Sequence, residues 1–75
     1  MSKDKKEYLE IYQKIGQNIK KQRLLKQFSQ EELAFKIGSA RNYIGCIERG
    51  EKFPSVAILY DIAKALDLPM KDLFL

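Results

Sequence analysis

The segment Gly38–Gly50 carries the side chains best suited to binding a partner molecule. Read as a helix, it places Ile44 and Ile47 on one side, because they are three residues apart. The other side carries the remaining distinctive side chains, namely Arg41, Asn42 and Cys46. Arginine and asparagine can form paired hydrogen bonds with guanine and adenine edges in the major groove. The pattern therefore predicts a short helix that reads double-stranded DNA while its isoleucines anchor it to a core.

Each reading residue has an alternative role. Arg41 could contact a phosphate, which adds affinity but no sequence information. Asn42 could cap the helix or contact a phosphate. Tyr43 either stacks against sugar and phosphate or packs between the second and third helices. A redox role for Cys46 would need a nearby cation or helix start to form the thiolate, and Arg49 is three residues away. We favour a small apolar filler or a contact with a thymine methyl group, because these roles are far more common for a cysteine.

The composition excludes several kinds of chemistry. The chain has no histidine and only one cysteine, so internal disulfides, His/Cys zinc clusters and histidine-based catalytic triads are ruled out. The acidic residues fall on solvent faces or helix caps, and no nucleophile–base arrangement or phosphate-binding loop is present. We therefore predict that the protein is not an enzyme, has no catalytic residue, and needs neither a metal nor a cofactor.

Charge is distributed unevenly along a chain of net charge +4. Residues 1–28 carry eight Lys/Arg against three Asp/Glu, residues 29–54 carry four of each, and residues 55–75 carry two against three. The basic first segment is either a phosphate-facing patch or an ordinary solvated helix.

The sequence shows no sign of membrane insertion or secretion. No apolar run approaches the ~18 residues of a membrane span. The start, Met-Ser-Lys-Asp-Lys-Lys, lacks the apolar segment of a secretory signal. A cytoplasmic protein without a membrane partner is expected.

Helical periodicity runs through the whole chain. The apolar spacing predicts an all-α protein, a compact five-helix bundle forming one domain over residues 1–75. Residues 1–7 are expected to fray. The first three predicted helices span about residues 8–26, 30–37 and 40–49. The fourth starts after Ser55 and has a row of apolar residues that runs to Leu66. The last spans residues 69–74.

The second and third predicted helices meet at a sharp bend. Ser29 can cap the second helix and Glu32 can return the hydrogen bond, which is the capping-box pattern. Gly38 can end this helix in the left-handed conformation, and Gly50 can end the third in the same way. Only two residues separate Gly38 from the third helix. So short a connection predicts a helix-turn-helix.

With these elements in place, the chain resembles the Cro and phage-repressor class of helix-turn-helix (Xre-type) transcriptional regulators. The resemblance covers about residues 14–74. Its segments are Ile19–Arg23, Ser29–Ala34, Ile37-Gly38, Ile44, Ile47–Gly50, Pro54-Ser55 and Ile62–Leu66. Within this class, Arg41–Glu51 is similar to the controller proteins of restriction–modification systems. The resemblance implies a sequence-specific DNA-binding regulator that acts as a homodimer on a near-palindromic operator.

The family implies roles for individual positions. Arg41, Asn42 and Cys46 match positions that reach base edges. Gln30, Arg49 and Lys52 match positions that contact the DNA backbone. We also assign Ser29 and Tyr43 to backbone contacts. Arg23 and Glu48 match a partly buried ion pair that joins the first helix to the third. The chain departs from the family at two positions before the third helix. Ser39 stands where the family usually has an apolar turn residue, and Ala40 stands where a capping Ser or Thr is common. We therefore expect Ser39 to cap the third helix.

An apolar C-terminal segment supplies the candidate dimer surface, over residues 67–75. The residues predicted to form the surface are Leu68, Met70, Leu73, Phe74 and Leu75 of this segment, joined by Tyr60 of the fourth predicted helix. The alternative is that they pack within their own subunit.

The same fold could also serve another class of function. The rival prediction is a protein-interaction module, such as an antitoxin or anti-factor, in which DNA binding is secondary. Contact with RNA polymerase is left open.

Overall fold

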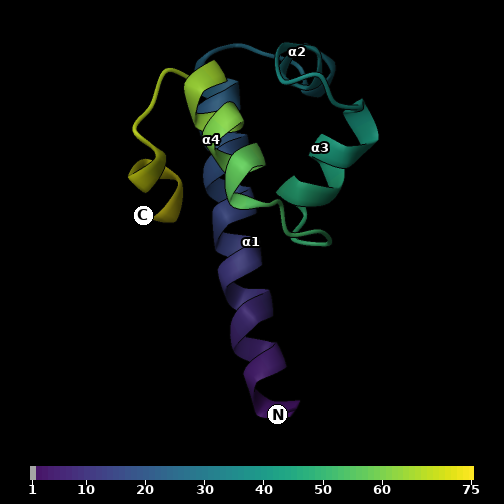
Figure 1. Cartoon of the computed structure of the whole chain (residues 1–75), viewed down its shortest axis with the longest axis vertical. Coiled ribbons are helices and arrows are strands. Elements are labelled where there is room, and N and C mark those ends of the chain that lie inside the picture. The colour runs from purple at the N-terminus through teal and green to yellow at the C-terminus, as the bar shows by residue number, and fades with distance from the viewer. Residues whose placement is uncertain (1) are drawn as a thin grey trace.

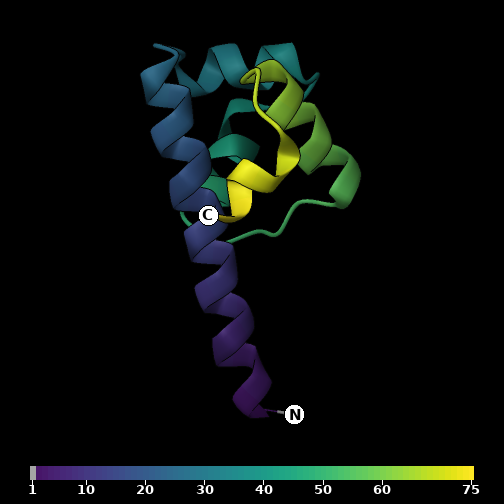
Figure 2. The same ribbon diagram turned by 90° about the vertical axis from the view of Figure 1, so that its left-hand side faces the viewer.

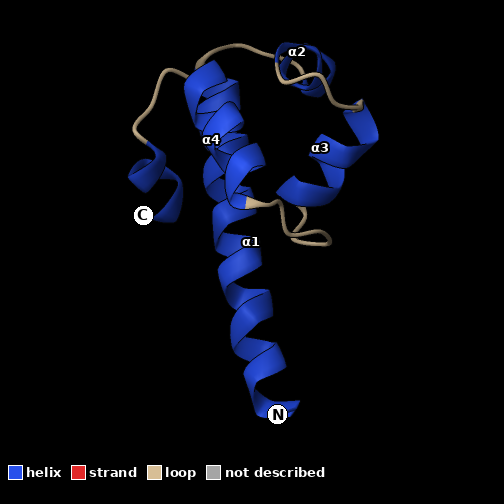
Figure 3. Cartoon of the chain, viewed as in Figure 1, coloured by secondary structure: helices blue, strands red, loops and turns tan. Residues whose placement is uncertain are grey.

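The computed structural model describes the backbone of residues 2–75 and the side chains of residues 6–75. These residues form four α-helices and one 3-10 helix without a strand, which confirms the all-α prediction (Figure 3). The elements are α1 (Ser2–Leu25), α2 (Gln30–Lys36), α3 (Arg41–Glu48), α4 (Val56–Ala65) and η1 (Met70–Phe74). The prediction of five α-helices is wrong at the last element. There, the N–H of Asp72 donates to the carbonyl of Pro69, three residues earlier, which is 3-10 spacing.

Helix α1 is longer than predicted. It begins at Ser2 rather than at about residue 8, so residues 2–7, expected to fray, are helical, while Met1 lies outside the described residues. The apolar stripe marks only the part of a helix that is buried, whereas Lys and Glu continue a helix well without burial. Its 24 residues predict a length of ~36 Å, close to the 37 Å long dimension of the molecule. The N-terminal half of α1 accordingly projects beyond the other helices (Figures 1 and 2).

The helix starts are set by serine at two places. At α2 the capping box forms as predicted: Ser29 Oγ accepts from the N–H of Glu32 at 3.0 Å, and Glu32 Oε1 accepts from the N–H of Ser29 at 2.7 Å. At α4, Ser55 Oγ accepts from the N–H of Ile58 at 3.2 Å. The expected cap of α3 by Ser39 is wrong, because the N-cap residue is Ala40, which has no polar side chain.

Left-handed residues end all four α-helices of the described chain. Two are the predicted glycines, Gly38 with φ 66° and Gly50 with φ 75°. The other two are Gln27 with φ 63° and Asp67 with φ 58°. At each non-glycine position the next N–H closes the helix, from Phe28 to the carbonyl of Arg23 and from Leu68 to the carbonyl of Ala63.

All five elements contribute to one hydrophobic core. Its members are Ile15 and Ile19 of α1, Leu33 and Ala34 of α2, Ile44 and Ile47 of α3, Leu59, Ile62 and Ala63 of α4, Leu66, and Leu73 of η1. Helix α3 packs against both α2 and α1, while η1 covers α1 and α4. Helices α1 and α2 together therefore hold α3 in place. Within the described part of the chain, no helix combines the length and the apolar character needed to cross a bilayer.

Candidate nucleic-acid interface

Helix α3 turns one side to the core and the other to solvent, as its sequence predicts. Ile44 and Ile47 are 0% and 1% exposed, so the helix is anchored along its inner side. Arg41 and Asn42 lie exposed in the first turn, and Cys46, four residues after Asn42, is half-buried on the same helix. The structure thus exposes two of the three side chains that the sequence assigns to base edges, and leaves the third half-buried.

A buried ion pair fixes the C-terminal end of α3 to α1. Arg23 Nε donates to Glu48 Oε2 at 2.7 Å and Arg23 Nη2 donates to Glu48 Oε1 at 3.1 Å. The side chains are only 7% and 2% exposed. Arg23 Nη1 also donates to the carbonyl of Phe28 at 2.7 Å, so the guanidinium is bound on three nitrogens. Paired and hydrogen-bonded in this way, the two charges hold the helices in one register.

Gln30 extends this network to α2. Its Nε2 donates to Glu48 Oε1 at 3.1 Å, which ties the start of α2 to the end of α3. The described side chains contain no buried nitrogen or oxygen that lacks a hydrogen-bond partner. Because Arg23, Gln30 and Glu48 come from three different helices, the network defines the angle at which α3 is presented. Gln30 is half-buried, so part of its amide also remains accessible to solvent.

Arg49 has a partner, Glu51, that the sequence did not indicate. Its Nε and Nη2 donate to the Glu51 carboxylate at 2.9 and 3.2 Å, and Nη2 lies 3.6 Å from Cys46 Sγ. The hydrogen bonds with Glu51 raise the pKa of Arg49. The same hydrogen bonds lower the pKa of Glu51. Both groups are therefore ionised at neutral pH, and the cation expected to face DNA already has a carboxylate beside it.

The remaining residues assigned to the DNA backbone differ in accessibility. Ser29 and Lys52 are exposed, although Ser29 Oγ already accepts the capping hydrogen bond. Tyr43 is half-buried against the hydrophobic core, which favours the packing interpretation of its ring. Its contact with a sugar or phosphate stays a prediction.

A close approach of α1 and α3 was not foreseen. A Cβ on Gly16 would lie 2.3 Å from the carbonyl oxygen of Ile47 and 2.7 Å from that of Glu48. No side chain fits there, so the glycine lets the two backbones meet. The available signal was a glycine inside an otherwise strong helical pattern, which often marks close packing. Gly16 thus belongs to the frame that positions α3.

The C-terminal residues assigned to a dimer surface do not behave alike. Leu73 is 0% exposed, and its carbonyl accepts from Asn18 Nδ2 at 2.9 Å. Its assignment to the dimer surface is therefore wrong, because the side chain fills the core of its own subunit. Leu68 and Met70 are half-buried against the core, whereas the remaining three are well exposed: Tyr60, Phe74 and Leu75.

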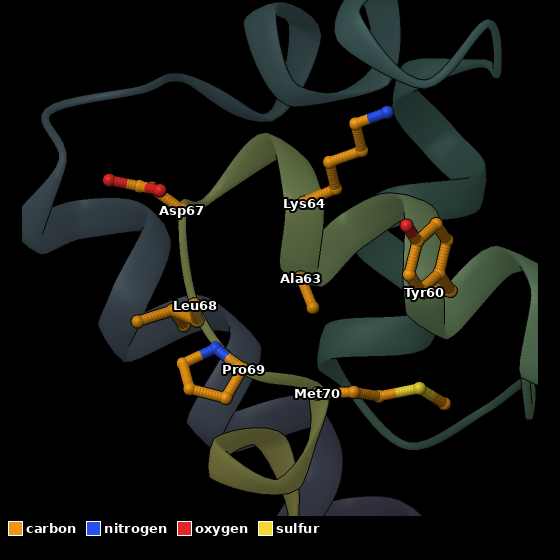
Figure 4. A pocket seen from close by; sticks show the side chains of 7 residues that line it. All are labelled: Tyr60, Ala63, Lys64, Asp67, Leu68, Pro69 and Met70. Atoms are coloured by element: carbon orange, nitrogen blue, oxygen red, sulfur yellow. The ribbon is translucent and has the colours of Figure 1, made fainter.

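Tyr60 also lines a shallow pocket between α4 and the chain that leads into η1 (Figure 4). Ala63 lies between Tyr60 on one side and Leu68 and Pro69 on the other, and Met70 borders the hollow from below. Lys64 and Asp67 complete its lining. Exposed Tyr60 is thus both an apolar surface residue and part of the pocket lining.

Comparisons with known proteins agree with this geometry. The family described as Helix-turn-helix matches residues 19–73. The control protein C.BamHI of Bacillus amyloliquefaciens is 44% identical over 59 residues, covering 77% of this chain and 73% of that protein. The HTH-type transcriptional regulator YazB of Bacillus subtilis is 38% identical over 58 residues, covering 77% and 84%. The crystal structure of the restriction–modification controller protein C.AhdI from Aeromonas hydrophila superposes with a TM-score of 0.86 at 37% identity, covering 89% of this chain and 97% of that one.

Proposed function

The chain belongs to the helix-turn-helix family of DNA-binding transcriptional regulators, and we propose that it acts as a homodimer that reads a near-palindromic operator through α3. The observation that carries this proposal is the two-sided character of α3. Its inner isoleucines are fully buried, while Arg41 and Asn42 are exposed in its first turn. A helix anchored in this way can enter a major groove with its N-terminal side chains toward the bases.

Direct readout falls to three residues in this proposal. Arg41 pairs with a guanine, Asn42 with an adenine, and Cys46 contacts the groove one turn later. Arg41 and Asn42 are exposed, and Cys46 is half-buried on the same helix. The network of Arg23, Gln30 and Glu48 holds their helix in one position against α1 and α2, which supports this assignment. Such a preformed frame supports specificity, because a base-reading side chain works only at a defined distance and angle.

Contacts to the DNA backbone surround the reading helix. They are assigned to Ser29, Gln30, Tyr43, Arg49 and Lys52. These residues lie at the start of α2, within α3, and in the segment that follows α3. Contacts from both ends of the helix-turn-helix would fix the register of α3 in the groove. The positive charge among them predicts binding that weakens steeply with salt.

Dimerisation is proposed because α3 alone covers only a few base pairs, too few to select a site in a genome. A two-fold dimer doubles the footprint and places half-sites about one helical turn, ~34–36 Å, apart. The exposed side chains of Phe74 and Leu75, and of Tyr60 at the pocket, support a contact through these residues. Leu68 and Met70 contribute their accessible parts.

The finer proposal is that the regulated genes encode a restriction–modification system. It rests on similarity to controller proteins from two organisms, at 44% and 37% identity. Relatives such as YazB carry only the broader description of an HTH-type regulator. A methyltransferase gene and a restriction-enzyme gene beside this one would support the controller assignment, and an unrelated neighbourhood would contradict it.

Selection from a pool of random duplexes tests the function directly. The purified full chain is incubated with the pool, bound duplexes are amplified over several rounds, and the enriched sequences are aligned. We expect two inverted half-sites and a shift to the dimer-bound species in gel electrophoresis with competitor DNA. Enrichment of no sequence would overturn DNA reading and leave the rival function, a protein-interaction module.

A further inference from the structure

The guanidinium of Arg49 folds back along the helix that it follows. A Cβ placed on Gly45 would lie 3.0 Å from Arg49 Nη1, so the guanidinium rests close to the glycine. Its Nε and Nη2 donate to Glu51 at 2.9 and 3.2 Å. Nη2 also lies 3.6 Å from Cys46 Sγ. The Nε–Nη2 edge of Arg49 is thus occupied by the carboxylate, and Nη1 faces the helix.

Glu51 is held at this place by its backbone. Its N–H donates to the carbonyl of Cys46 at 2.9 Å, a hydrogen bond that closes the last turn of α3. The backbone of Glu51 therefore stays at the end of α3, on the helix proposed to enter the groove, with its carboxylate in reach of Arg49. Because the Glu51 side chain is 55% exposed, a change of rotamer can release Arg49 without breaking this backbone hydrogen bond.

The Arg49–Glu51 pair differs from the buried pair in the frame. Its side chains are 58% and 55% exposed, against 7% and 2% for Arg23 and Glu48. Water and salt compete with so exposed a pair, so it contributes little to folding. We therefore expect the Arg49–Glu51 pair to affect the binding of a ligand by the Arg49 guanidinium rather than the stability of the fold.

A carboxylate and a phosphate offer a guanidinium the same geometry. Each presents two oxygens to two parallel N–H groups, and the Nε–Nη2 edge is one that a phosphate can use in this way. In the free protein Glu51 already fills that edge with two hydrogen bonds. A DNA phosphate that approaches Arg49 there must displace it.

We propose that Glu51 is an internal competitor of the DNA backbone for Arg49. The inference rests on the proposed function, because it needs the end of α3 to lie against DNA. A phosphate contact by Arg49 then exchanges one charge-assisted pair for another, so its net gain is small. Since phosphates carry no sequence information, Glu51 raises the protein concentration needed for binding without changing which sequence is selected.

A double-mutant cycle tests the competition. Wild type, Glu51→Gln, Arg49→Ala and the double variant are titrated, as full chains, against a labelled duplex enriched by the selection and against a shuffled duplex of equal length. We expect Glu51→Gln to tighten binding about two- to five-fold on both duplexes, the range of an exposed ion pair. In the Arg49→Ala background, the same substitution is expected to change the affinity by less than about 1.5-fold.

Two controls accompany the cycle. Glu10→Gln removes the same charge from an exposed position on α1, and we expect it to leave the affinity unchanged. Circular dichroism of each variant should show the wild-type helix content, because Arg49 and Glu51 are exposed.

The other outcomes separate two failures. Equal tightening by Glu51→Gln with and without Arg49 would mean plain repulsion between Glu51 and DNA, and would overturn the competition. Weaker binding of Glu51→Gln would mean that Glu51 orients Arg49 for DNA, and would overturn it as well. Either result leaves DNA reading by α3 intact. If wild type binds neither duplex at any salt concentration, the proposed function fails and the inference fails with it.

Discussion

Gly16 of α1 and Ile47 of α3 approach so closely that a Cβ on Gly16 would lie 2.3 Å from the carbonyl oxygen of Ile47. The obstacle is a backbone atom, so a change of rotamer cannot relieve the overlap. Together with the ion pair between Arg23 and Glu48, this contact sets the distance between the two helices. The position of the proposed reading helix therefore depends on a residue of α1 that is not itself assigned a DNA contact.

The close approach predicts that Gly16→Ala destabilises the protein. The added methyl group forces α1 and α3 apart, and the resulting strain exceeds the gain of about 1 kcal/mol that alanine brings to a helix. We expect a net loss of about 2 kcal/mol in the free energy of unfolding, typical of an overpacked core. Urea denaturation followed by circular dichroism measures it.

Gly45→Ala is the matched control. Its neighbours within 4 Å are side-chain ends, Arg49 Nη1 at 3.0 Å and the Gln30 amide at 3.7 Å, which can shift. We expect unchanged stability or a gain of up to about 1 kcal/mol from helix propensity. If Gly16→Ala were as stable as Gly45→Ala, the close contact between α1 and α3 would be wrong.

The end of α1 offers a stabilising substitution. Gln27 has φ 63°, a conformation that costs a residue with a side chain about 1–2 kcal/mol. Gln27→Gly should therefore raise the free energy of unfolding by about 1 kcal/mol, partly reduced by the entropy of glycine in the unfolded chain. Gln17→Gly, at an exposed position inside α1, should instead lower it by about 1 kcal/mol. Destabilisation by both substitutions would contradict the left-handed end of α1.

The buried ion pair predicts a large effect of Glu48→Gln. The substitution leaves the Arg23 charge inside the protein without its counter-ion, and breaking a buried pair typically costs about 3 kcal/mol or more. For a domain of this size the thermal midpoint should fall by more than about 10 °C. Glu51→Gln removes an exposed partner and should barely move it. A Glu48→Gln variant with the wild-type midpoint would refute the energetic role of the pair.

Local signals account for most of what the sequence predicted. The capping box of Ser29 and Glu32 and the left-handed Gly38 and Gly50 depend only on neighbouring residues, so they could be identified without a tertiary structure. Apolar periodicity likewise indicated which side of α3 is buried. The start of α1 was missed because periodicity ends where burial ends, while the helix continues to Ser2.

Features that depend on the packed molecule were harder to predict. Nothing local distinguishes Leu73, which fills the core, from the neighbouring Phe74, which is 48% exposed. Gln27 and Asp67 adopt a conformation that favours glycine, because the chain must turn there to pack. Residues two apart in sequence do not face each other on a helix. The contact of Arg49 with Glu51 therefore arises only because the chain leaves α3 between them.

Two neighbouring residues of the C-terminal segment are expected to have different roles, Leu73 in folding and Phe74 in dimerisation. Leu73→Ala removes a fully buried side chain and should cost about 3 kcal/mol of stability. Phe74→Ser should leave the helix content intact but weaken the dimer, because it removes an exposed apolar contact. Analytical ultracentrifugation at several concentrations measures the second effect. A Phe74→Ser variant with the wild-type dissociation constant would exclude Phe74 from the interface.

The sharpest functional prediction contrasts Arg41 with Lys52, which are both exposed cations. Arg41→Ala should lose about 1–3 kcal/mol on the selected duplex, and only where the guanine that it reads is present, so specificity relaxes at one base pair. Lys52→Ala should weaken binding to all sequences alike and reduce the salt dependence by about one phosphate contact. Fluorescence anisotropy with the selected duplex and its single-base variants resolves the two patterns. Uniform weakening by Arg41→Ala would reassign that residue to the DNA backbone, because a phosphate contact cannot distinguish one base pair from another.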